Sequence, residues 1–356
     1  MKSFAEIPGE VVRRTAAGER IALILLDALG LDLLMREHDH PLVRRLDLVP
    51  LNSQFPSTTA AHVTTMHLGQ PVEQHGLYEW RVLEPSLDEV IVPLRYRRDD
   101  SDLDGELDGR LDPMALIASS TLYARLATRS VVVEPSGVAG TPYDRVATAG
   151  AQSAEFETLE QGLEQLSEAM RADPRLGYGY VYWPVIDATG HRFGPSSAQF
   201  RAAARAALDA VERQAAALHR LGVTVLLTAD HGQIDVHPDR VDYLDQLWPE
   251  LTDHLTHRAA GSCRDVFLHV NQHAVDHVIE NLAPRLDGRA HVCRASDLFP
   301  DAGPRLAARL ADVAVLPADG RMAWLQATPS VEAWNLGQHG GRAARETATY
   351  LARVQA

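Results

Sequence analysis

The stretch IALILLDALG at residues 21–30 decides the fold, because an unbroken apolar run ends there in Asp27 and is followed by glycine. A continuous apolar run of this length is typical of a strand that is buried on both faces of a parallel sheet. Further runs of this kind lie at 130–133, 177–186 and 223–228. The sequence therefore predicts several parallel strands in one buried sheet.

Amphipathic helical patterns separate these runs. The clearest covers about 197–221, where apolar residues recur on one face and Gly222 is placed to end the helix. Other patterns cover roughly 57–68, 114–128 and 155–172. The alternation of strands and helices predicts an α/β fold with a doubly wound, mostly parallel sheet.

The pattern changes after residue 239, which indicates a second unit. This part has a helical pattern near 239–256, a strand at 265–270, a helix at 272–284 and a strand near 290–293. We therefore expect residues 240–330 to form a smaller α+β cap on a core made of residues 1–239 and 331–356. After GQHGG at 337–341 the chain is expected to end in a helix.

The composition indicates an ordinary globular protein. The chain has 356 residues, of which 46% are hydrophobic, and a formal net charge of −14, which disfavours nucleic acids and anionic membrane surfaces. Cys263 and Cys293 lack the spacing of a metal finger or a disulfide framework, as expected of structural thiols in a reducing compartment. No signal peptide and no membrane-length apolar run are evident, so a cytoplasmic location is expected.

Carboxylates and imidazoles follow several of the predicted strands. Asp27 follows the first, and Asp230 and His231 follow the run at 223–228. Asp187 and His191 follow the run at 177–186 and converge on one cation if the chain makes a tight turn there. An Asp in such a place is also a common helix cap.

A late glycine-rich turn adds His339, which a surface turn would explain equally well on its own. The joint occurrence is what points to chemistry, because ligands bind outside the carboxyl ends of parallel strands. Six oxygen and nitrogen ligands suit two divalent ions, most naturally zinc, with manganese as the alternative.

A candidate nucleophile lies in FPSTTAAH at 55–62. Pro56 and Ser57 indicate a helix start, so Thr58 and Thr59 fall in the first turn, where free N–H groups favour negative charge. These hydroxyls would be ordinary caps in isolation. Metal coordination is one of the few ways to activate a Thr hydroxyl, so the neighbouring ligand set favours a catalytic role.

Five motifs occur in an order that resembles the alkaline phosphatase superfamily, within its type I phosphodiesterase and nucleotide pyrophosphatase branch. They are ILLDALG (24–30), FPSTTAAH (55–62), DATGHRFGP (187–195), TADHG (228–232) and GQHGG (337–341). The resemblance covers nearly the whole chain.

This resemblance implies two metal ions and a covalent phosphothreonine intermediate. One ion would be held by the nucleophilic Thr together with Asp27, Asp230 and His231. The other would be held by Asp187, His191 and His339.

The register of the nucleophile is set by spacing. Counting from Pro56 and from Gly69 places the family's threonine at Thr59, whereas counting from His62 favours Thr58. We choose Thr59, since adjacent residues of a helix differ by about 100° and only one can face the metals.

The expected activity is hydrolysis of a phosphodiester or pyrophosphate, with a nucleotide as one candidate substrate. Where nucleotide-cleaving members have an Asn that holds a phosphate oxygen, this chain has Trp80. A diester is expected to be preferred over a monoester, because only Arg192 among the motif residues would help to neutralise a dianion. The alternatives are a phosphomonoesterase or phosphonate hydrolase on the same core, and a metal-stabilised binding protein without turnover.

Overall fold

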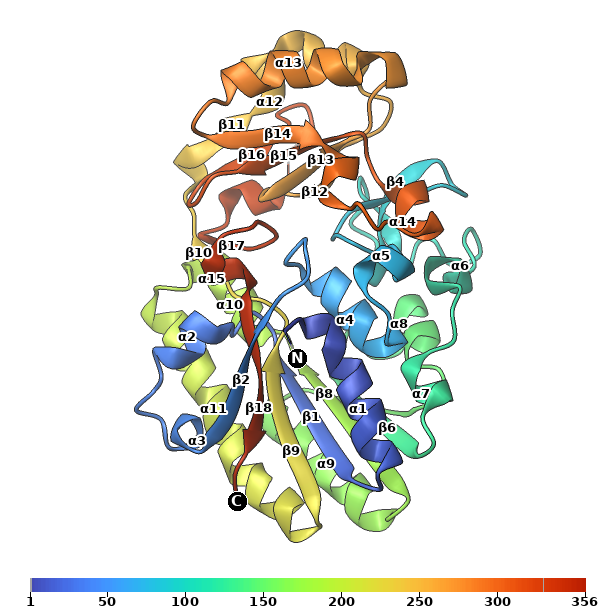
Figure 1. Ribbon diagram of the computed structural model, residues 1–356, viewed down its shortest axis with the longest axis vertical. Coiled ribbons are helices and arrows are strands. Elements are labelled where there is room, and N and C mark those ends of the chain that lie inside the picture. The colour runs from blue at the N-terminus through green and yellow to red at the C-terminus, as the bar shows by residue number, and fades with distance from the viewer. Residues whose placement is uncertain (1, 329) are drawn as a thin grey trace.

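The chain is built on one seven-stranded sheet (Figure 1). The computed structural model describes residues 2–328 and 330–356. The strand order across the sheet is β2 (Leu46–Asn52), β18 (Ala348–Val354), β9 (Val223–Ala229), β1 (Arg20–Leu26), β8 (Leu176–Trp183), β6 (Arg129–Pro135) and β7 (Gln152–Phe156). Neighbouring strands are parallel except at β18, which runs antiparallel to both β2 and β9. The predicted mostly parallel α/β sheet is confirmed.

Helices cover both faces of this sheet, as expected of a doubly wound fold (Figure 1). The helices α9 (Leu159–Ala172), α10 (Val185–Phe193) and α11 (Ala198–Arg220) pack on one face, and α1 (Ile7–Ala16) and α4 (Thr59–Leu68) pack on the other.

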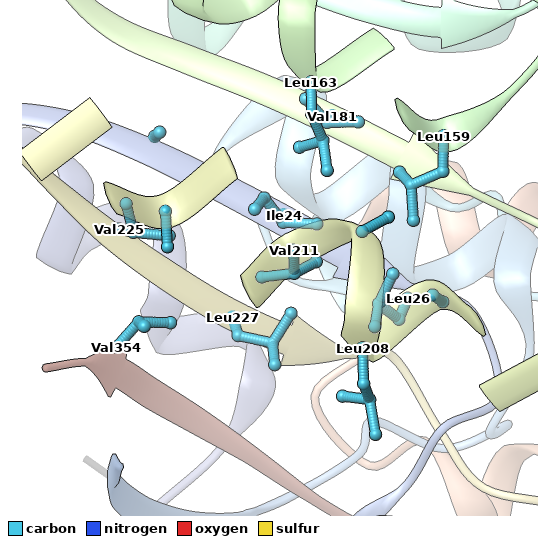
Figure 2. Packing of buried hydrophobic residues seen from close by; sticks show 14 of the residues in the cluster. Ile24, Leu26, Leu159, Leu163, Val181, Leu208, Val211, Val225, Leu227 and Val354 are labelled. Carbon is cyan, nitrogen blue, oxygen red and sulfur yellow. The ribbon is translucent and has the colours of Figure 1, made fainter. Parts of the chain in front are cut away.

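The apolar side chains of β1 are buried on both faces of the sheet, because successive side chains of a strand point in opposite directions. Ile24 packs with Val211 of α11 in the cluster of Figure 2. Leu23 and Leu25 belong to the cluster on the other face. This two-sided burial explains why β1 reads as a continuous apolar run.

A smaller unit lies above the carboxyl end of the sheet (Figure 1). Its four-stranded antiparallel sheet has the order β12 (Ala260–Ser262), β13 (Asp265–Leu268), β15 (Val313–Pro317) and β14 (Ala290–Arg294), and α13 (Val275–Arg285) packs on it. These elements fall inside residues 240–330. That the unit is a domain with those bounds stays a prediction.

The expected final helix is wrong. After residue 341 the chain makes only the short helix α15 (Ala344–Thr347) and then enters the large sheet as β18. Tyr350 and Ala352 pack on one face of that sheet, and Leu351 packs on the other. Burial between β2 and β9 therefore makes this segment a strand.

Two other predicted helices are interrupted. The segment 114–128 is split into α6 (Pro113–Ile117) and α7 (Leu122–Arg125), because Ala118 adopts a left-handed conformation that ends α6. The segment 239–256 forms a short strand and two short helical turns, with Pro249 starting the second turn.

No helix in the described part of the chain is long and apolar enough to cross a membrane.

Candidate active site

Three of the predicted ligands lie at the carboxyl ends of adjacent strands. Asp27 follows β1, and Asp230 and His231 follow β9, which pairs with β1. All three side chains are at most 1% exposed, and His231 Nε2 lies 3.4 Å from Asp27 Oδ1 and 3.3 Å from Asp230 Oδ2. Ala28 has a left-handed backbone with φ 61°, and its N–H donates to Asp230 Oδ1 at 3.1 Å. We call Asp27, Asp230 and His231 the inner set.

Asp187 and His191 are brought together by a helix, and the predicted tight turn at Gly190 is wrong. Both lie on α10, one turn apart, and His191 Nε2 is 3.2 Å from Asp187 Oδ2. Gly190 is needed for another reason, because a Cβ atom there would lie 1.8 Å from Oε1 of Gln233.

His339 joins this pair from a distant part of the chain. It follows β17 (Gly337–Gln338), and its Nε2 lies 3.2 Å from Nε2 of His191 and 3.5 Å from Asp187 Oδ1. Its ring also stacks on His231 at a centroid distance of 3.8 Å. We call Asp187, His191 and His339 the outer set, which therefore touches the inner set.

Each of the three imidazoles turns its Nδ1 toward a backbone carbonyl. His191 bonds to Gly337 O at 2.9 Å, His231 to Gly232 O at 3.0 Å and His339 to Ser57 O at 2.9 Å. A carbonyl only accepts, so each Nδ1 carries a proton and each Nε2 faces the centre of the site. Burial lowers the pKa of His231 and of His339, so Nε2 of these two rings keeps its lone pair there. This is the arrangement of metal-ligating histidines.

The buried carboxylates of the inner set lack a cationic partner. Burial and the neighbouring Asp230 raise the pKa of Asp27 well above its usual value, and burial raises the pKa of Asp230 to about 7. Oδ2 of Asp230 has no hydrogen-bond partner among the described residues. Burial also lowers the pKa of His231 well below its usual value. A neutral imidazole beside two buried carboxylates fits a cation site.

The outer set already contains an ion pair. Burial disfavours the charge on Asp187, but the neighbouring His191 outweighs it and lowers the carboxyl pKa. Burial likewise opposes the charge on His191, but Asp187 raises its pKa to about 9.

At this site, potential ligand atoms form two close groups, each within 4.8 Å: Asp27, Asp230 and His231, and Asp187, His231 and His339. The first is the inner set. The second contains His231 where the resemblance implies His191, so the two groups share one imidazole.

The two candidate threonines point in different directions. Thr59 is the first residue of α4, and its Oγ1 lies 3.3 Å from Asp27 Oδ2 and 3.3 Å from His231 Nε2. Thr58 precedes the helix, and its hydroxyl donates instead to the carbonyl of Tyr78 at 3.3 Å without capping α4. The geometry favours Thr59 as the residue that faces the ligands.

A cavity of about 560 Å³ opens over these groups, and Thr59, Trp80, Arg81, Arg192 and His339 contribute to its lining. The guanidinium of Arg81 is paired with two carboxylates, at 2.5 Å from Asp99 and 2.6 Å from Glu332. Arg192 is exposed and stacks over Phe193.

The sequence analysis missed two supporting side chains. Tyr182, near the end of β8, donates its hydroxyl to Asp27 Oδ2 at 2.5 Å, and the amide of Gln233 donates to Asp187 Oδ1. Both hold a ligand carboxylate. The position of Tyr182 near the end of a predicted strand could have indicated a role at the site. A tyrosine within an apolar run, however, is normally interpreted as a core residue.

Several proteins of known structure have a similar fold. The family described as type I phosphodiesterase / nucleotide pyrophosphatase matches residues 21–342. Murine ectonucleotide pyrophosphatase / phosphodiesterase 5, solved as an inactive variant in complex with AMP, superposes with a TM-score of 0.71 at 16% identity, covering 94% of this chain and 87% of that one. The human protein of the same name gives 0.70 at 17% identity over 94% and 87%.

Phosphonoacetate hydrolase from Sinorhizobium meliloti 1021, in complex with phosphonoformate, has a TM-score of 0.63 at 15% identity, covering 95% of this chain and 90% of that one. No curated protein matches the sequence of the chain. These structural neighbours establish the fold, and the family match extends over nearly the whole chain. The chain belongs to the type I phosphodiesterase / nucleotide pyrophosphatase family of phosphoester hydrolases, within the alkaline phosphatase superfamily.

Proposed function

We propose that the protein hydrolyses a phosphodiester or pyrophosphate bond with two bound divalent ions and a phosphothreonine intermediate on Thr59. The observation that carries the proposal is the convergence of three Nε2 atoms and three carboxyl groups beside the Thr59 hydroxyl. Nitrogen and oxygen donors in this mixture suit zinc, with manganese as the alternative. When bound, such ions lower the pKa of the nucleophile and neutralise charge on the phosphoryl group.

The residues of the chain position the reacting groups. Asp27 and His231 hold Oγ1 of Thr59 from two sides, and Tyr182 orients Asp27 through its hydroxyl. Thr59 is the first residue of α4, where the first-turn N–H groups and the helix dipole favour the negative charge of a phosphoryl group.

The reaction has two steps. In the first, a bond forms between Oγ1 of Thr59 and phosphorus while the bond to the leaving oxygen breaks, and the Thr59 proton is given up to the solvent. In the second, a water oxygen attacks the phosphorus, the bond to Thr59 breaks and the hydroxyl regains a proton.

Charge in the cavity supports a diester, which carries one negative charge. Arg81 is already paired with Asp99 and Glu332, and Arg97, which also lines the cavity, is paired with Asp104. Arg192 is therefore the lining arginine free of a carboxylate partner among the described residues. A phosphonate hydrolase is the second candidate, supported by the structural similarity to phosphonoacetate hydrolase. A nucleotide remains a candidate substrate, since the murine neighbour was solved with AMP.

The test uses the purified chain loaded with zinc or with manganese. We expect bis(p-nitrophenyl) phosphate to be hydrolysed with a higher kcat/KM than p-nitrophenyl phosphate, and acid quenching to trap a phosphate on Thr59 that mass spectrometry locates. Phosphate on Thr58, or a faster reaction with the monoester or with phosphonoacetate, would contradict the proposal. No hydrolysis of any of these substrates with either metal would favour a binding protein.

A further inference from the structure

A second cavity, of about 210 Å³, starts beside the nucleophile and follows α4. Thr59, Val63 and His67 line it from this helix. These positions are four residues apart on one helix face, so Thr59 and His67 are separated by about 12 Å along the axis. The cavity therefore has one end at the reacting phosphorus and another two helical turns away.

The far end is lined by two buried carboxyl groups. Glu134 lies at the end of β6, and Asp144 lies on α8 (Pro142–Ala147). Each of these residues is 3% exposed. Sequence analysis passed over Glu134, although it follows the apolar run 130–133 in the way that Asp27 follows its own run.

Neither carboxyl group is fully partnered. Among the described residues, no N–H or hydroxyl group donates a hydrogen bond to Oε2 of Glu134 or to Oδ1 of Asp144. Asp144 Oδ2 accepts from the N–H of Gly140 at 2.6 Å, and Glu134 Oε1 lies 3.6 Å from Nε2 of His67. The two carboxyl groups also lie within hydrogen-bond reach of each other and share a proton, whose place a donor group of a ligand would take at the inner end of the cavity.

No residue that the structure describes supplies a cation at this end. Burial lowers the pKa of His67 to about 4, so its imidazole is neutral. Arg95 is the arginine of the lining, but it is exposed and lies 3.3 Å from Asp104. Burial together with Glu134 raises the pKa of Asp144 to about 7, as expected where two carboxyl groups lie together without a counter-charge.

The walls between the two ends are largely apolar. Leu94, Val138 and the rings of Tyr143 and Tyr182 contribute to them. The Tyr143 hydroxyl is already bonded to Thr64 at 2.7 Å, and that of Tyr182 to Asp27. Such walls suit an alkyl chain or a sugar, whereas the acidic end needs a donor group.

We propose that this cavity binds one organic substituent of the phosphodiester, and that the substituent ends in a protonated amine held by Glu134 and Asp144. The inference rests on the proposed function, since it takes Thr59 as the residue that holds the phosphorus. An ammonium group offers donors to both carboxyl groups and removes the cost of buried, unpaired charge. A neutral nucleobase amine would supply donors without that charge.

The test compares p-nitrophenyl phosphodiesters that differ only in the second ester group. One carries aminopentyl, a second carries hexyl, in which a methyl replaces the ammonium, and a third carries adenosine. The metal-loaded wild-type chain is expected to have a kcat/KM roughly 10-fold to 100-fold higher for aminopentyl than for hexyl, mainly through KM, because a charge-assisted hydrogen bond is gained.

Two variants test whether Glu134 and Asp144 cause the preference for the aminopentyl ester. Glu134→Gln and, independently, Asp144→Asn should bring the aminopentyl to hexyl ratio close to one. The matched control is Glu155→Gln on the exposed edge of β7, which should keep the wild-type ratio. Inhibition of hexyl ester hydrolysis by butylammonium, but not by butanol, should follow the same pattern across these variants.

The outcomes separate this inference from the proposed function. Equal kcat/KM for the aminopentyl and hexyl esters in the wild type overturns the cavity assignment while leaving the diesterase intact, even if no variant folds. Preference for the adenosine ester over the aminopentyl ester overturns the assignment of a cation. Absence of hydrolysis of all three esters overturns the proposed function itself, and calorimetry that finds butylammonium bound no more tightly than butanol by the wild-type chain then overturns the cavity assignment too.

Discussion

The inner and outer sets of the site are built from different kinds of structure. The inner set comes from the ends of two paired strands at the centre of the large sheet, and its side chains are at most 1% exposed. The outer set comes from α10 and from the loop around His339, and its side chains are 11–23% exposed. The comparison teaches that one half of the site is as deeply buried as the core, whereas the other depends on contacts between distant segments.

The loop that carries His339 depends on the smaller unit. A Cβ atom at Gly340 would lie 2.8 Å from Asp265 Oδ1 and 2.9 Å from Ser262 Oγ. Ser57, just before α4, accepts from the N–H of Gly340 at 3.2 Å and donates to the carbonyl of Gly341 at 2.9 Å. His339 is therefore positioned jointly by the smaller unit and by the segment that leads to Thr59.

The largest effect is expected from Thr59→Ala, because it removes the nucleophile that both sets would serve. Turnover should fall by at least about 1000-fold, in kcat, while folding and metal content stay at wild-type values. Steady-state kinetics measure kcat, and elemental analysis measures the metal content. Thr59→Ser, which keeps a hydroxyl, is the control and should retain a phosphoenzyme. Wild-type turnover in the alanine variant would remove Thr59 from the mechanism.

Asp230→Asn should damage the inner set severely. Its carboxylate is 0% exposed, so water has no room to take its place. We expect the bound metal to fall from two ions to one and kcat to fall by about 100-fold or more, beyond the usual cost of losing a supporting residue. Two retained ions in this variant would show that Asp230 is not a ligand.

His339→Ala should have a smaller effect, because its side chain is 11% exposed and water can replace it. We expect kcat to fall by about 10-fold to 100-fold, with partial recovery when zinc or manganese is added in excess. Metal titration followed by activity measures the recovery. A loss larger than that of Asp230→Asn would reverse the comparison between the two sets.

Stability should depend on pH through the carboxyl groups behind the outer set. Burial and Glu332 raise the pKa of Glu79 to about 8 from a usual value of 4.5. The folded chain then binds more protons than the unfolded chain between these values, so this group lowers stability as the pH rises from 4.5 to 8. Urea unfolding across this range should show a smaller decline for Glu79→Gln. Exposed Glu157→Gln is the control, and an equal decline in both variants would contradict the assignment.

The smallest effect is expected from Thr58→Ala, because this hydroxyl faces away from both sets and is bonded only to Tyr78. The loss of one buried hydrogen bond should lower the free energy of unfolding by about 0.5–1.5 kcal/mol. The kcat should change by less than about twofold, since the Thr59 hydroxyl is untouched. Urea unfolding and steady-state kinetics measure both quantities, and a collapse of kcat would move the nucleophile to Thr58.

The sequence alone predicted the parts of this protein that are encoded locally. Apolar runs and helical periodicity marked β1, β9 and α11, because a strand or helix buried in a core must be apolar along its length or along one face. Six of the seven candidate site residues were named from their position after such runs or in a glycine-rich turn, and Thr59 was named from a helix start and its spacing to Pro56 and Gly69. The structure gathers them in one place, although their roles stay proposals.

Only the tertiary structure decided what depends on distant neighbours. The last segment forms β18 because it lies between β2 and β9, where both of its faces are buried. Asp187 and His191 lie close together because both are on α10, where Gly190 leaves room for the side chain of Gln233. Glu134 and Tyr182 line the cavities because β6, β8 and β1 lie side by side, an order that no local pattern contains. Local sequence specifies which faces are buried, whereas the packing of strands far apart in the chain decides which side chains meet.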